Sequence, residues 1–404
     1  PAPQADPGRA SPQAATPAAP VLPVGDESTA LTSKSGETLG SSSSQASSEE
    51  DPARVVGIIV RLQDGADRAA SLASINEAVA GAFPGASAEV TREYSNTFSG
   101  VALKAPAGSL DAIRAASGVQ GAFIDRETHV SDVAGVDAEG GFQATRLADQ
   151  NPDNLSAQVI MHADQVSQRG QGKVVAIIDT GVDMTHPAFA GTLSGTPALS
   201  ADKVASLTPK LGDGKDGVYV NEKFPFAYDY ADEDNDASPL EPHGTHVAGI
   251  AAANAGEIMG VAPDAQIIVA KVEQDGGGML DSALLAALDD MAILHPDVVN
   301  LSLGQDAGMD NAADSLYAGV FETLQDKGII VDVAAGNAFS SGYGNASGKN
   351  LPYASDPDSS TLGEPATYSP TLSVASLDNL LSVNAFTAAG KNIAYQRARG
   401  EGGG

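Results

Sequence analysis

Three short segments of the sequence hold side chains whose types and order suit acyl-transfer chemistry. Asp179 closes a run of β-branched residues, His243 opens the sequence His-Gly-Thr-His-Val-Ala-Gly, and Asn337 follows a Gly. A carboxylate can orient an imidazole and stabilise its charged form, and the imidazole can take and return a proton near neutral pH. An amide can donate a hydrogen bond to a developing oxyanion. The order therefore predicts an acid, a base and an oxyanion donor.

Each of these residues also has an ordinary structural interpretation. An Asp at the end of a strand is often a turn former, a single His at a helix end often lies in solvent, and a Gly-Asn pair often marks a turn. His246, three residues after His243, adds the rival hypothesis of a metal-dependent hydrolase. The chain has no Cys and no His-Glu-x-x-His sequence, which disfavours zinc. The joint occurrence of all three segments in order favours acyl transfer.

The elements that must position these residues alternate between strands and helices. Uninterrupted apolar runs predict strands buried on both faces, and 3.6-residue periodicity predicts helices between them. We expect strands at 174–178, 267–272, 298–303 and 329–334, and helices at 247–254, 282–294 and 311–327. This alternation predicts an α/β fold, a parallel sheet with helices on both faces. Asp179, Gly304 and Asn337 fall at or near the carboxyl ends of strands, where such sheets place functional residues.

The first 130 residues differ from the rest in composition and in hydrophobic pattern. Residues 1–53 are rich in Pro, Ala and Ser without apolar periodicity, which indicates a disordered lead. Residues 54–130 predict strands at 55–62, 88–94, 100–104 and 119–124 with helices at 69–83 and 109–116. The order β-α-β-β-α-β is that of a ferredoxin-like α+β unit.

Composition excludes several classes of function. The 404 residues carry a net charge of −30, with 52 acidic and 22 basic residues, which argues against nucleic acid and anionic membranes as partners. The absence of Cys excludes disulfides and thiol catalysis, and no apolar run is long enough for a membrane span. The sequence opens on Pro1 without a leader, so we expect a removed signal peptide or a record that begins mid-chain. An acidic secreted or cell-surface protein is the simpler interpretation.

Together, Asp-Thr-Gly at 179, His-Gly-Thr-His-Val-Ala-Gly at 243 and Ala-Ala-Gly-Asn at 334 resemble the signatures of the subtilisin-like serine peptidases. The resemblance covers residues 161–378 and implies that Asp179 is the orienting acid, His243 the general base and Asn337 the oxyanion-hole side chain. It also implies that 299–304 and 274–278 flank an extended peptide substrate; ordinary sheet interior and a flexible loop are the alternative. The implied substrate-binding residues are Ser302, Leu303, Gly304, Gly277, Gly278, Ala335 and Gly336.

Within that family, the segments 351–358, 363–366 and 372–376 look most like the lactocepin-type cell-envelope proteinases. In that group a protease-associated domain is inserted before the catalytic Ser, so residues 379–404 resemble the start of such an insert. The Gly-Thr pairs at 191, 195 and 244 continue with Leu, Pro and His, and no Gly-Thr-Ser occurs. We therefore expect these 404 residues to lack the nucleophile and to be inactive alone. A non-catalytic peptide-binding pseudo-peptidase is the alternative.

Residues 54–130 resemble the propeptide that chaperones and then inhibits these peptidases, and residues 94–101 are the most telling part. The resemblance implies this prodomain as a partner in cis, a processing region within 131–160, and polypeptide substrates. It also implies that no cofactor is required. The acidic run 232–236 fails the EF-hand template, because Ala237 and His243 stand at its sixth and twelfth positions, and a solvated loop is favoured. Structural calcium elsewhere is implied by the family, without identified ligands.

Overall fold

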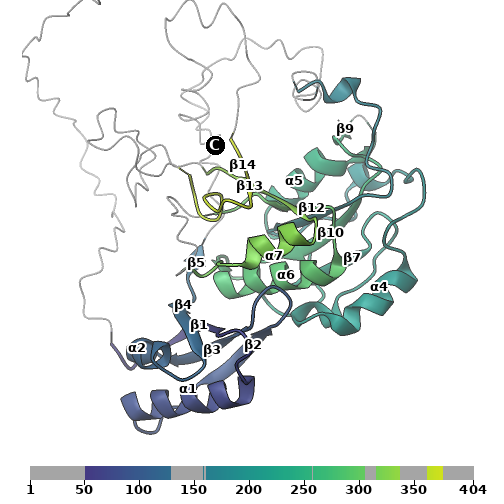
Figure 1. Ribbon diagram of the computed structural model, residues 1–404. Helices are drawn as coiled ribbons and strands as arrows, with labels where there is room; N and C mark the ends of the chain where they lie inside the picture. Colours follow the sequence, from purple (N-terminus) through teal and green to yellow (C-terminus); the bar gives the residue numbers. More distant parts are fainter. Residues whose placement is uncertain are drawn as a thin grey trace, which may run out of the picture. The chain divides into compact units, whose positions relative to one another are not determined.

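The computed structural model describes residues 51–128, 158, 161–256, 258–304, 315–336 and 362–375 (Figure 1). The predictions for the lead at 1–50, for Asn337, for most of the connector 131–160 and for 379–404 lie outside these residues. Within them, no helix has both the length and the apolar character that a membrane span requires.

The N-terminal part is a four-stranded antiparallel sheet with two helices. Its elements are β1 (Val55–Leu62), α1 (Arg68–Ala82), β2 (Glu89–Tyr94), β3 (Gly100–Pro106), α2 (Leu110–Arg114) and β4 (Val119–Ile124). The strand order is β2-β3-β1-β4, so β1 lies between β3 and β4. Asp67 caps α1 by accepting a hydrogen bond from the backbone of Ala70, as N-terminal Asp residues commonly do.

Both faces of this sheet are covered, because successive side chains of a strand point to opposite faces. Ile58, Val60 and Leu62 of β1 pack in one cluster with Ile75 of α1 and Ile113 of α2. Ile59, between them, belongs to a second cluster that includes Tyr94, Phe98 and side chains of the following sheet. The N-terminal sheet therefore shares a core with the rest of the described chain.

The second part is a six-stranded sheet in the order β14-β13-β12-β6-β10-β7, and every pairing in it is parallel. Its strands are β6 (Val174–Asp179), β7 (Phe226–Asp229), β10 (Gln266–Lys271), β12 (Val298–Leu301), β13 (Ile330–Ala334) and β14 (Leu372–Val374). The helices are α4 (Ala201–Leu207), α5 (His243–Ala252), α6 (Asp281–Leu294) and α7 (Val320–Asp326). The short strands β5 (Glu127–Thr128), β8 (Asn254–Ala255), β9 (Ile258–Met259) and β11 (Met279–Leu280) form two-stranded pairs.

Helices cover both faces of the parallel sheet, which confirms the predicted α/β architecture (Figure 1). Ile177 of β6 and Ile267 of β10 pack against Ala248 and other residues of α5. Ile178 and Ile268, their neighbours in sequence, pack on the opposite face with side chains from α4, α6 and α7. The apolar runs are continuous because residues on both faces of these strands are buried.

Two differences from the sequence prediction concern helices. The helix predicted over 311–327 is wrong at its start, since α7 begins at Val320 and the described residues 315–319 form turns. Gly319 has a φ of 73°, a left-handed conformation that ends the preceding turn rather than continuing a helix. The helix predicted from residue 247 begins earlier, at His243, so the imidazole lies on the first turn of α5.

Candidate active site

The structure brings Asp179 and His243 together. Nδ1 of His243 lies 2.6 Å from Oδ1 of Asp179, and the carboxylate is almost fully buried while the imidazole is 22% exposed. The same carboxylate oxygen accepts the backbone N–H of Thr180 at 2.8 Å. The strand end thus fixes the carboxylate, and the carboxylate fixes the ring.

Close contact between β6 and the start of α5 makes this pairing geometrically available. A Cβ on Gly244 would lie 2.2 Å from the carbonyl oxygen of Gly181 and 3.0 Å from Oδ1 of Asp179, so only Gly permits this approach. Hydrogen bonds add to the contact, from the Gly244 N–H to Oγ1 of Thr180 at 3.0 Å and from the Asp183 N–H to Oγ1 of Thr245 at 2.8 Å. The residues next to Asp179 and His243 in the sequence are therefore needed to bring the two side chains together: Gly244 allows the close approach, and Thr180 and Thr245 supply hydrogen bonds.

The surroundings of the imidazole favour its protonated form. The hydrogen bond to Asp179 raises the pKa of His243 above its usual value, and the negative charges of Glu241 and Glu273 add to this effect against the opposing effect of burial. Burial and the nearby Glu241 also raise the pKa of Glu273. Sequence reasoning missed both glutamates, which are ordinary polar residues until the fold places them beside the ring.

The predicted substrate-binding residues lie at the same edge of the parallel sheet as Asp179. Ile178 pairs with Leu301, and Leu301 pairs with Val333, so the residues after β12 and at the end of β13 are level with the end of β6. These residues are Ser302, Leu303, Gly304, Ala335 and Gly336. A third segment, 363–365, joins them, because the Gly363 N–H donates to the Ala335 carbonyl at 3.0 Å and a Cβ on Gly304 would lie 2.7 Å from the Glu364 carbonyl oxygen.

Gly277 and Gly278 lie in a tight turn between β10 and β11. Both have positive φ, of 82° and 88°, and the Gln274 N–H donates to the Gly278 carbonyl at 2.9 Å. Directly after this turn, β11 pairs antiparallel with β5, which lies at the end of the N-terminal part. Met279 pairs with Thr128 and Leu280 with Glu127. This edge therefore accepts an extended segment as a neighbouring strand.

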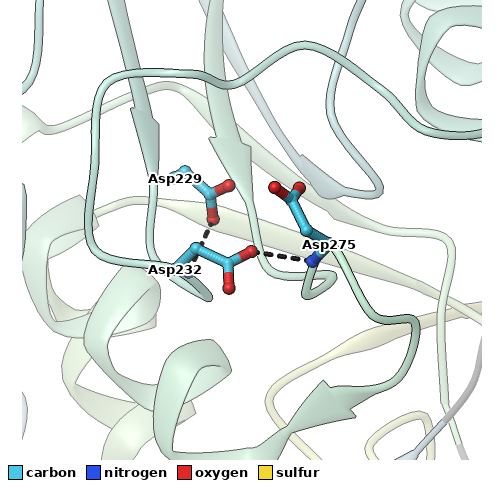
Figure 2. Close-up of side chains that lie close together, drawn as sticks. All are labelled: Asp229, Asp232 and Asp275. Carbon is cyan, nitrogen blue, oxygen red and sulfur yellow. Dashed lines mark hydrogen bonds between the residues drawn. The ribbon is translucent and has the colours of Figure 1, made fainter.

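One acidic cluster lies near this edge, formed by Asp229, Asp232 and Asp275 (Figure 2). Their ligand atoms lie within 4.8 Å of one another, as a cation site would require. However, the ammonium group of the buried Lys271 lies 2.7 Å from a carboxylate oxygen of both Asp229 and Asp275. These two hydrogen bonds and charges raise the Lys271 pKa despite its burial. The cluster already has an internal cation and does not fit a metal ion as its resident charge.

Asn337, the third residue predicted for the chemistry, lies outside the described residues, as does the rest of 337–361. The described chain ends there at Gly336, whose φ of 99° gives a left-handed turn directly after β13. The arrangement that the structure does show is a buried carboxylate hydrogen-bonded to a partly exposed imidazole, beside an edge that accepts an extended strand. Such a pair can hold one tautomer of the His and move a proton at the other ring nitrogen.

Comparison with known proteins agrees with this geometry. The subtilase family model matches residues 170–401. The PIII-type proteinase of Lactococcus lactis subsp. cremoris is 36% identical over 228 residues, which are 52% of this chain and 11% of that protein. The PII-type proteinase of Lacticaseibacillus paracasei is 36% identical over 228 residues, or 12% of its length, and the C5a peptidase of Streptococcus pyogenes serotype M3 is 33% identical over 219 residues, or 18% of its length. The chain thus spans less than a fifth of these relatives, and the family match covers more than half of the chain. The chain belongs to the subtilase family of serine peptidases.

Proposed function

We propose that this chain is part of a secreted or cell-wall-associated serine endopeptidase, made as a zymogen in which residues 54–130 are an inhibitory propeptide. The domain boundaries proposed are a lead at 1–53, the propeptide at 54–130, a connector with the processing site at 131–160, the catalytic domain at 161–378 and the start of an insert at 379–404. The relatives named above, all proteinases or peptidases, support the substrate class of polypeptides.

The observation that carries the proposal is the 2.6 Å contact between Asp179 and His243. Since Nδ1 donates to the carboxylate, Nε2 is the nitrogen that takes the proton from a serine hydroxyl and later returns it to the leaving amine. Asp179 holds this tautomer and stabilises the imidazolium that forms. Asn337 and the backbone N–H of the serine hold the oxyanion. Within the 404 residues no Gly-Thr-Ser occurs, so we expect a polypeptide limited to them to leave protein substrates intact.

Contacts between the two sheets support the propeptide role. Asp289 of α6 is buried and accepts hydrogen bonds from the backbone N–H groups of Ser95, Asn96 and Thr97, and from the side chains of the last two. The loop between β2 and β3 thus presents several donors to one carboxylate, a charge-assisted arrangement. The Phe98 and Tyr94 rings of the same region stack, with centroids 4.8 Å apart, inside the shared core.

A second group of contacts involves Arg92, within β2 and two residues before its last residue, Tyr94. The guanidinium of Arg92, 6% exposed, forms ion pairs with Asp213 and Glu233 and donates to the Tyr230 carbonyl at 2.7 Å. The Arg92–Asp213 pair is largely buried, and removing one partner of such a pair strongly destabilises a protein. The N-terminal unit therefore has both apolar and ionic reasons to stay bound after cleavage of the connector, which is what inhibition in cis requires.

The test compares the complete protein with its His243→Ala variant in the hydrolysis of casein. We expect the variant to lose about 10⁴-fold or more of the activity, the scale found when a triad member is removed from a serine peptidase. The exposed His246→Ala substitution is the matched control and should change activity by less than about threefold. Equal hydrolysis by the complete protein and the His243→Ala variant would contradict the proposal. Absence of hydrolysis in both would favour the peptide-binding pseudo-peptidase.

A further inference from the structure

A small acidic pocket lies between the two sheets, and a side chain of the N-terminal unit contributes to its lining. Asp281 and Glu364 provide its carboxylates, and Leu284, Leu303, Tyr317 and Pro365 line it. The remaining free volume is about 10 Å³, roughly the space of one water. The guanidinium of Arg126, whose side chain is 40% exposed, also lines the pocket and contacts both carboxylates.

Both carboxylates are shared in the same way between the guanidinium and a tyrosine. One oxygen of Asp281 accepts Nε of Arg126 at 2.9 Å and the other accepts the Tyr317 hydroxyl at 2.7 Å. One oxygen of Glu364 accepts the two Nη groups of Arg126 at 3.2 and 3.3 Å, and the other accepts the Tyr368 hydroxyl at 2.9 Å. The side chain of Asp281 is 4% exposed and that of Glu364 is 15% exposed. This is a built site that holds a planar, charged donor by two carboxylates.

The backbone around Arg126 is held as an added strand. The Asp281 N–H donates to the Arg126 carbonyl at 3.1 Å, and the next two residues, Glu127 and Thr128, pair antiparallel with β11. Main-chain pairing of this kind accepts many sequences, whereas side-chain pockets along the edge select among them. The pocket is therefore the selective element beside a strand-binding edge that is tolerant of sequence.

The direction of the added strand relates the pocket to the Asp179–His243 pair. From Glu127 to Thr128 the strand runs from Leu280 toward Met279, that is, toward the turn that follows β10. The last residue of β10, Lys271, pairs with Asp179. An extended peptide that takes the same path meets the pocket first and the Asp179–His243 pair later, so the pocket receives a side chain on the N-terminal side of the bond at that pair.

Loss of Arg126 from the pocket would leave two largely buried carboxylates close together without their cation. Burial disfavours the charged form of Asp281, and the positive charge of Arg126 opposes that effect on the pKa of Asp281. The carboxylate of Asp281 is only 4% exposed, so loss of its cation is costly, and a new cation from a bound peptide restores the ion pair. The vacated pocket thus favours a peptide that brings a basic side chain.

We propose that the Asp281–Glu364 pocket is a specificity site for a basic residue, arginine before lysine, on the N-terminal side of the cleaved bond. The inference rests on the proposed peptidase function and adds its substrate class, extended peptides with a guanidinium at one fixed position. Arg126 is the internal occupant of that site while the N-terminal unit is bound. Arginine binds this site better than lysine because its planar guanidinium contacts both carboxylates at once, whereas the lysine ammonium is a point charge.

The test measures kcat/KM of the complete, processed protein on a series of extended peptides. One arginine is moved through the positions N-terminal to the cleaved bond, and at the best position it is replaced by lysine, citrulline, norleucine or glutamate. We expect kcat/KM for the arginine peptide to exceed that for the peptide with its neutral isostere citrulline about tenfold or more, which is the effect of a charged hydrogen bond. Lysine should fall between the two, and glutamate should be the poorest.

The variant Glu364→Gln should reduce the arginine-to-citrulline ratio to less than about threefold, and Asp281→Asn should do the same. Asp326→Asn, an exposed acid on α7, is the matched control and should keep the ratio of the unaltered protein. Cleavage of all peptides without preference for arginine at any position would overturn this inference and leave the proposed function standing. Cleavage of none of them would overturn the proposed function, and this inference with it. Because the peptide series needs no variant, poor folding of either substituted protein leaves the result decisive.

Discussion

The interface between the N-terminal unit and α6 gives a prediction of defined size for Asp289→Asn. The two carboxylate oxygens of Asp289 accept the Thr97 N–H and hydroxyl at 2.7 Å, the Asn96 N–H at 2.9 Å and the Asn96 side-chain amide at 3.0 Å. In the variant, one oxygen becomes an NH₂ group that cannot accept, so at least two donors lose their partner. Each buried donor without a partner costs about 1–3 kcal/mol, so the loop loses about 3 kcal/mol. That energy corresponds to a change of about 100-fold in the opening equilibrium.

Hydrogen exchange of the backbone amides in residues 94–98, followed by mass spectrometry, measures this opening. We expect protection of these amides in the Asp289→Asn chain to fall about 100-fold, while amides of the parallel sheet, such as Ile177, keep most of their protection. Asp326→Asn is the control for loss of one acid from this side of the protein and should change protection by less than about threefold. Unchanged protection in Asp289→Asn would refute the reasoning that one carboxylate holds the loop in place.

Three further predictions concern charge and pH. Because Asp179 and Glu273 raise the pKa of His243, the neutral base should form only above the usual pKa near 6.5, and the pH–rate profile of kcat/KM for Glu273→Gln should shift to lower pH; an unshifted profile would contradict this. Burial raises the pKa of Asp332 to about 6, so its contribution to stability is present below about pH 4, the usual carboxyl pKa, and is lost as pH rises through 6. Asp332→Asn should therefore raise the melting temperature at pH 8 and not at pH 4, and equal effects at both pH values would refute this. Lys271→Met should destabilise the chain by about 3–5 kcal/mol in urea unfolding, since two carboxylates lose their buried cation, and millimolar calcium should recover part of this loss in the variant alone. An unchanged free energy of unfolding in Lys271→Met would show that the ammonium does not hold the cluster together.

The sequence predicts the strands of the parallel sheet well because burial on both faces leaves an uninterrupted apolar run. The strand expected at 174–178 is β6 and the strand expected at 267–272 is β10, with each bound shifted by one residue at most. The common edge of the sheet follows from parallel pairing, so Asp179 and the residues after β12 are expected at one end of the sheet before any coordinates. The 2.6 Å contact with His243 then requires only that α5 begins beside that edge.

Other elements have no comparable signal. β7 and β14, of four and three residues, are too short to stand out from loops, and α4 follows a polar segment that gives only a Ser cap at Ser200. The ionic contacts are harder still, because Asp289 and Thr97 are 192 residues apart in the chain and nothing local links them. The same holds for Arg126, Asp281 and Glu364, whose acidic pocket exists only where two sheets meet. Composition shows the excess of acid, and the fold decides which acids find a partner.

The most direct test of the account is the rate of peptide-bond hydrolysis by the Asp179→Asn variant of the complete protein. This change keeps the shape of the buried side chain but presents an amide to the His243 ring, which favours the wrong tautomer and removes the charge that stabilises the imidazolium. We predict a fall in kcat of about 10⁴-fold with KM within about threefold of the unaltered protein. A kcat that stays within tenfold of the unaltered protein would contradict the claim that Asp179 and His243 work as one acid–base unit.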